Sequence, residues 1–92
     1  MSTTLSVWIT DQTKTASGDW RTTGHHEYLT NSEEAEVRDE IARVHQREAA
    51  HRMKLPVKER RTRKLVYDVA VGCVILENTE TRSRTIWEIG AR

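Results

Sequence analysis

This 92-residue chain has no phenylalanine, one cysteine, one proline and no long hydrophobic run. A single cysteine cannot form a disulfide within the chain, and nothing in the sequence indicates secretion, which favours a reducing compartment. The longest apolar run, residues 69–76, has the length of one strand and falls well short of the roughly 20 residues that cross a bilayer. No signal peptide is recognisable, so we expect a cytoplasmic protein without a membrane partner.

Motifs for catalysis and metal binding are also missing. His25 and His26 would point to opposite faces of a strand, and His45 and His51 lie on different sides of a helix, so the histidines make a poor zinc site. Cys73 lies among apolar residues with no cationic neighbour in sequence, which is typical of a structural thiol. The glycines form no phosphate-binding loop. We therefore predict that the protein is not an enzyme, with no catalytic residue, metal, cofactor or small-molecule substrate.

The stretch from Thr30 to Met53 predicts one amphipathic helix of about six turns. Thr30 or Asn31 is the expected N-cap, because each is followed three residues later by a glutamate, as in a capping box. Pro56 should prevent the helix from continuing. The most regular apolar residues form one thin stripe: Val37, Ile41 and Val44. We therefore expect the helix to pack one narrow side against a flat surface such as a sheet.

The remainder of the chain shows strand patterns. Alternation of apolar and polar residues predicts strands over residues 5–10 and 81–89. Residues 20–29 alternate more weakly and can form a further strand, interrupted or bulged at Gly24. Residues 65–76 are apolar on both faces, which predicts one central strand. The order β-β-α-β-β indicates a single α+β domain over residues 1–92, a small antiparallel sheet of about four strands with the long helix across one face. The predicted core is Leu5, Val7, Ile9, Val37, Ile41, Val44, Leu65, Tyr67, Val69, Val71, Cys73, Ile75, Trp87 and Ile89. Whether Trp8, Trp20 and Trp87 belong to the core or to an interface stays open.

The net charge of +1 hides an asymmetry along the chain. Residues 1–40 carry three basic and eight acidic side chains, and residues 41–92 carry twelve basic and six acidic ones. Such a charge dipole favours association with charged partners.

The basic residues are densest after the helix and recur in the last strand, and they are our candidates for phosphate-backbone contacts: Lys54, Lys58, Arg60, Arg61, Arg63, Lys64, Arg82 and Arg84. The alternative is a solubilising loop. No aromatic residue interleaves with this run, so we do not expect base stacking.

Three features together resemble a known group of proteins: the acidic helix start Glu33–Glu40, the basic run Lys54–Lys64, and the strand pair 65–76 and 81–89. With the short length and the missing catalytic motifs, they are similar in format to small phage-encoded anti-CRISPR proteins. The likeness is greatest to inhibitors of the type I-F surveillance complex, called Csy or Cascade.

The resemblance implies a non-catalytic inhibitor, monomeric when free, in the cytoplasm of the host bacterium. Its partner would be the multi-subunit protein–RNA complex and its guide RNA. It would block target DNA binding by steric and electrostatic occlusion, with the basic residues on the guide-RNA backbone. The alternative function is a stand-alone nucleic-acid-binding regulatory protein. The near-zero net charge and the acidic half of the chain argue against that alternative.

Overall fold

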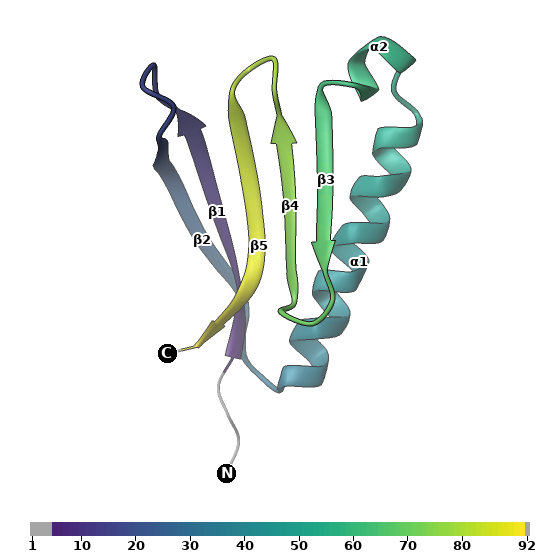
Figure 1. The fold of residues 1–92 in the computed structure, drawn as a ribbon. Helices are drawn as coiled ribbons and strands as arrows, with labels where there is room; N and C mark the ends of the chain where they lie inside the picture. Colours follow the sequence, from purple (N-terminus) through teal and green to yellow (C-terminus); the bar gives the residue numbers. More distant parts are fainter. Residues whose placement is uncertain (1–4, 92) are drawn as a thin grey trace.

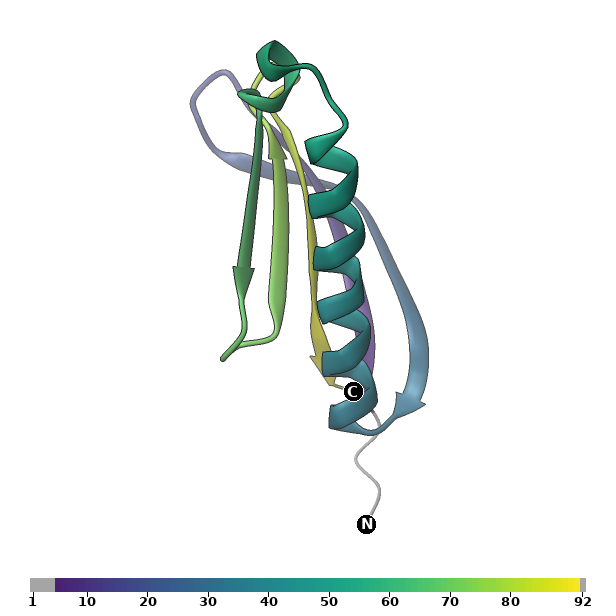
Figure 2. The same ribbon diagram turned by 90° about the vertical axis from the view of Figure 1, so that its right-hand side faces the viewer.

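A computed structural model describes residues 5–91 as a five-stranded antiparallel sheet with one long helix packed on it. The elements follow the chain as β1 (Leu5–Lys14), β2 (Trp20–Ser32), α1 (Glu34–Met53), α2 (Val57–Arg60), β3 (Arg63–Asp68), β4 (Cys73–Asn78) and β5 (Ser83–Ala91). The strand order is β2-β1-β5-β4-β3, and α1 runs along one face of the twisted sheet (Figures 1 and 2). The α+β prediction is confirmed, with five strands in place of about four.

The additional strand arises because residues 65–76 form a hairpin and not one central strand. β3 ends at Asp68, whose carboxylate accepts a hydrogen bond from the Val71 backbone N–H at 3.1 Å. Gly72 follows with a φ of 78°, a conformation that glycine adopts without steric cost. Asp68 and Gly72 are the turn signals in the sequence, but the three apolar residues between them continue the hydrophobic pattern, so periodicity alone predicts one strand.

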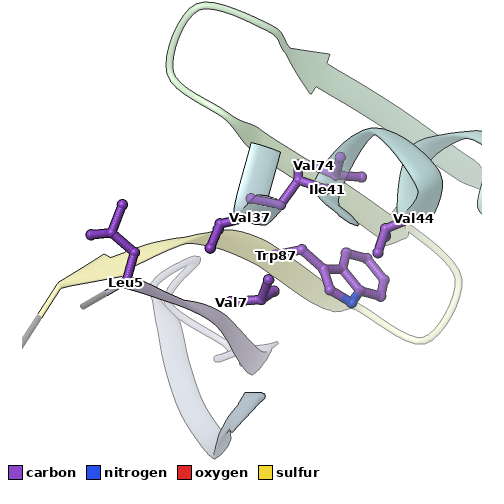
Figure 3. Close-up of a cluster of buried hydrophobic side chains, with 7 residues drawn as sticks. All are labelled: Leu5, Val7, Val37, Ile41, Val44, Val74 and Trp87. Atoms are coloured by element: carbon purple, nitrogen blue, oxygen red, sulfur yellow. The ribbon is translucent and has the colours of Figure 1, made fainter. Parts of the chain in front are cut away.

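The core is one layer of side chains between α1 and the sheet (Figure 3). Its buried apolar residues are Leu5, Val7, Val37, Ile41, Val44, Val74 and Trp87. Partly buried side chains pack around them: Ile9, Tyr28, Leu65, Tyr67, Leu76 and Ile89. The helix contributes only the predicted thin stripe to the buried core, and its other side chains are half-buried or exposed. Trp87 therefore belongs to the core, filling space that phenylalanine occupies in many small domains.

Part of the predicted core is wrong, because the hairpin reverses the alternation of faces beyond the turn. Val74 faces the helix and is fully buried, whereas Cys73 and Ile75 lie on the opposite face of the sheet. Val69 and Val71 lie in the turn and are 66% and 62% exposed. Asp68 pairs with Cys73 across a turn of four residues, so these two side chains lie on the same face of the sheet. In one continuous strand they would lie on opposite faces, so every side chain after the turn is on the face opposite to the predicted one.

The predicted N-cap is also wrong. β2 continues through Ser32, Glu33 takes the N-cap position, and no side chain caps the helix. Leu29 and Asn31 have φ values of 54° and 59°, so the chain changes direction locally where the sequence predicts the first helical turn. Strand pairing with β1 outweighs the local capping-box preference of Thr30 and Asn31.

The β1–β2 ribbon is longer than predicted and reaches Lys14. The predicted bulge at Gly24 is confirmed, because Asp11 pairs with Gly24 whereas Gln12 pairs with Thr22. The ribbon carries the β1–β2 turn to the same end of the molecule as α2 and the β4–β5 turn (Figure 1). The principal extents are 48 × 30 × 19 Å, so the molecule has two well-separated ends.

Candidate nucleic-acid interface

Segments from distant parts of the chain that carry basic residues meet at the end of the molecule that carries α2 (Figure 1). Lys14 closes β1, and its backbone N–H donates to the Arg82 carbonyl at 2.7 Å, which holds these two residues side by side. The exposed cations here, which we call the basic end, are Lys14, Lys54, Lys58, Arg61, Lys64 and Arg82. Five of them are predicted contact residues, and Lys14 joins them through the fold.

A hollow of about 320 Å³ lies among three of these cations. It is lined by Lys14, Lys64, Arg82, Thr79 and Glu77. The Arg82 guanidinium is oriented by donation to the Thr15 carbonyl at 2.8 Å. Three positive charges against one carboxylate make the hollow an anion-attracting concavity of a size that admits a phosphate group.

Arg84 occupies a different environment from the other candidate cations. Its guanidinium carbon lies 4.1 Å from the centroid of the Trp20 indole, and its Nε donates to the Gln12 side-chain oxygen at 2.6 Å. The Lys14 ammonium lies 5.6 Å from the same centroid. The fold thus places an aromatic ring among the basic residues, which the sequence analysis did not expect. No sequence signal could reveal it, because Trp20 and Arg84 meet only through β1, the strand between theirs.

Two predicted contact residues instead hold the connector between α1 and β3. The Arg60 guanidinium turns inward, and its Nη2 donates to the carbonyls of Met53 and Leu55 at 3.2 and 3.1 Å. Arg63 is half-buried, and its Nη1 donates to Thr62 Oγ1 at 2.7 Å. Their positive charge adds to the local potential, but their side chains serve the structure of the connector.

Arg52, at the end of α1, completes this bracing. Its Nε donates to the Arg63 carbonyl at 2.9 Å and its Nη2 donates to the Arg60 carbonyl at 3.3 Å. The connector is therefore an ordered segment with outward-facing Lys54, Lys58 and Arg61. An ordered basic segment loses less conformational entropy on binding than a flexible one does.

The other end of the molecule is acidic. The exposed first turns of α1 and the far ends of β3 and β5 contribute these carboxylates: Glu33, Glu34, Glu36, Asp39, Asp68 and Glu88. Arg38 lies among them, and its Nε contacts the Glu34 carboxylate at 3.1 Å. The charge asymmetry of the sequence is therefore a spatial dipole along the long axis.

Three half-buried groups have shifted pKa values. Burial and a hydrogen bond to Glu40, 2.7 Å long, raise the pKa of Tyr28 to about 12. The same bond holds the pKa of the Glu40 carboxyl below its usual range. Burial, with Glu88 and Asp68 nearby, raises the pKa of Cys73, so its thiol is protonated at neutral pH.

Within residues 5–91, no three histidine, cysteine or acidic side chains are grouped as metal ligands. Neither α1 nor α2 is both long and apolar enough to cross a membrane. Comparisons with protein-family models, curated protein sequences and solved structures find no match to this chain.

Proposed function

We propose that this protein is a non-catalytic binding protein whose basic end contacts the phosphate backbone of nucleic acid held in a larger protein–RNA assembly. The observation that carries the proposal is the convergence of exposed cations from β1, β3 and the β4–β5 turn around one hollow, with the exposed cations of the connector at the same end of the molecule. Lysine and arginine at this density neutralise phosphates and release counterions. Cytoplasmic location in a bacterium belongs to the same proposal.

The acidic end is the reason for favouring a nucleoprotein over free nucleic acid. Its carboxylates would repel a naked duplex that ran along the 48 Å axis, but they suit a basic protein surface. A protein–RNA complex offers both surfaces side by side. The target that the resemblance implies is the type I-F CRISPR guide-RNA complex, where the protein would act as an inhibitor. It would block target DNA binding by steric and electrostatic occlusion.

One observation favours a second function, a stand-alone nucleic-acid-binding regulator. Trp20 is half-buried and lies near the cationic groups of Lys14 and Arg84, and an indole beside cations can stack on the bases of a single strand. On this alternative, free single-stranded RNA would bind with an affinity that depends on Trp20. The two functions therefore differ in whether naked RNA is a ligand.

The test compares two double variants with the same change of charge. Lys58→Glu with Arg61→Glu alters the basic end, and Arg43→Glu with Arg47→Glu alters the exposed middle of α1. Arg60 is left unchanged because it braces the connector. Affinity for a purified type I-F guide-RNA complex is measured at several salt concentrations.

We expect the basic-end variant to bind at least about tenfold more weakly. The slope of log affinity against log salt concentration should become shallower by about one unit for each lost phosphate contact. The α1 variant should bind much as the wild type does. Wild-type affinity in a correctly folded basic-end variant would refute the proposed role of the basic end. Tight binding to naked RNA that Trp20→Ala abolishes would favour the stand-alone regulator.

A further inference from the structure

α1 covers only one face of the sheet, and nothing else within residues 5–91 packs over the other face, which we call the open face. The strand registers place its side chains in rows that run across the strands. The middle row is His25, Thr10, Ile86, Ile75 and Val66, from β2, β1, β5, β4 and β3 in order. Ile86 and Ile75 are half-buried and Val66 is 55% exposed, so these three residues form an apolar strip that is partly exposed to solvent.

Charged residues flank this strip with opposite signs on its two sides. In β5 the open face reads Arg84, Ile86, Glu88, and in β3 it reads Lys64, Val66, Asp68. Both strands therefore carry a base, an apolar residue and an acid at steps of two residues. Successive residues on one face of a strand are about 6.7 Å apart, so acid and base lie at equal distances from the apolar row.

The geometry points to a second copy of this chain as the occupant of the open face, in a two-fold symmetric dimer whose axis runs along the middle row. Rotation by 180° about that axis places each apolar side chain over its own copy. It also places Glu88 over the partner's Arg84 and Asp68 over the partner's Lys64. A two-fold interface must be self-complementary, and this pattern satisfies that condition without any change of backbone.

Other residues of the open face agree with this arrangement. Glu77 lies between Arg84 and Lys64 in its own sheet, so those two cations offset its charge. Glu27 accepts a hydrogen bond from the Trp8 indole N–H at 3.0 Å and stays partnered within the protomer. Nucleic acid suits this face less well, because the acids at one end would repel its phosphates along half of the surface.

The dimer should be weak. Five strands about 4.8 Å apart and rows about 6.7 Å apart give the contacting surface a planar area of only about 300 to 400 Å². Stable interfaces bury about 800 Å² on each partner, so we expect dissociation in the micromolar range rather than the nanomolar. This departs from the sequence-based expectation of a free monomer. The inference does not rest on the proposed binding to a nucleoprotein, although Lys64 belongs to both surfaces.

The experiment is sedimentation velocity of the wild-type protein from about 5 to 500 µM at low salt. We expect a concentration-dependent shift from monomer to dimer. Ile86→Glu places a charge against its own copy and should leave only monomer at every concentration. Gln46→Glu, on the exposed side of α1, is the matched control and should dimerise like the wild type.

A charge swap tests the register. Glu88→Arg and Arg84→Glu should each weaken the dimer at least tenfold, because each places like charges opposite one another. An equimolar mixture of the two variants should dimerise again, since both cross-pairs then join Arg to Glu. Circular dichroism melts verify that each variant is folded, because Arg84 also stacks on Trp20.

Three results would overturn the inference. One is a wild-type protein that stays monomeric at 500 µM and low salt. A second is a dimer that persists in folded Ile86→Glu, which would place the interface elsewhere. The third is a mixture of folded Glu88→Arg and Arg84→Glu that fails to form the mixed dimer. None of these depends on binding to RNA or to a nucleoprotein.

Discussion

Gly90 lies beneath the indole of Trp8, and this contact predicts an unusual response to one added methyl group. A Cβ on Gly90 would approach three atoms of that indole far more closely than the 3.0 Å that real Cβ atoms respect. The ring has little freedom to move aside. Its Nε1 donates to the Glu27 carboxylate at 3.0 Å, and His25 packs against it edge-on with centroids 5.5 Å apart. Gly90→Ala must therefore displace Trp8 or shift the strand.

The expected cost of Gly90→Ala follows from three contributions. Overpacking costs about 1 to 3 kcal/mol, and weakening the charge-assisted bond to Glu27 adds about 1 kcal/mol. The smaller loss of backbone entropy when alanine folds into a strand, compared with glycine, offsets roughly 0.5 to 1 kcal/mol of this cost. The net destabilisation should be about 2 kcal/mol. In a Trp8→Ala background only the backbone contribution remains, so the same change should stabilise the protein by about 0.5 kcal/mol.

Urea unfolding of the four proteins in this cycle, followed by far-ultraviolet circular dichroism, measures both effects. With a slope near 1 kcal/mol per molar urea, as expected for a chain of this length, the midpoint should fall by about 2 M in the wild-type background. It should rise slightly in the Trp8→Ala background. Equal costs of Gly90→Ala in both backgrounds would show that the two residues are uncoupled and would refute the reasoning.

Two further predictions concern the contacts between α1 and the sheet. Tyr28→Phe removes the 2.7 Å hydrogen bond to Glu40 and should cost about 1 to 2 kcal/mol at pH 7. Because the folded-state pKa of Tyr28 is raised to about 12, the free energy of unfolding of the wild type should fall as the pH rises from about 10 to 12. Urea unfolding at each pH should show that Tyr28→Phe lacks this fall. Tyr67→Phe is the matched control. Ile41→Ala empties a fully buried position and should cost about 3 kcal/mol, whereas Gln46→Ala on the exposed side of the same helix should change the unfolding free energy by less than about 0.5 kcal/mol.

Features that depend on a few neighbouring residues could be read from the sequence. The helix, its thin apolar stripe and its end before Pro56 follow from helical periodicity and from the missing backbone donor of proline. The bulge at Gly24 follows from a weakened alternation of side chains. The basic connector follows from composition, and five of the predicted contact residues, four of them from the run Lys54–Lys64, are exposed at one end of the molecule.

Features that depend on strand pairing required the tertiary structure. The turn at residues 69–72 contains three consecutive apolar residues, so the apolar run predicts one strand although it holds two. The faces predicted for the side chains after the turn are therefore wrong. Lys14 joins the basic end, and Trp20 reaches Arg84, only because β1 lies between β2 and β5. The sequence by itself determined the long helix, the strand character of most of the remaining chain and the separation of charge along the chain. Register and strand order decided which residues meet, because those choices are set by long-range packing and hydrogen bonding that no short window of sequence contains.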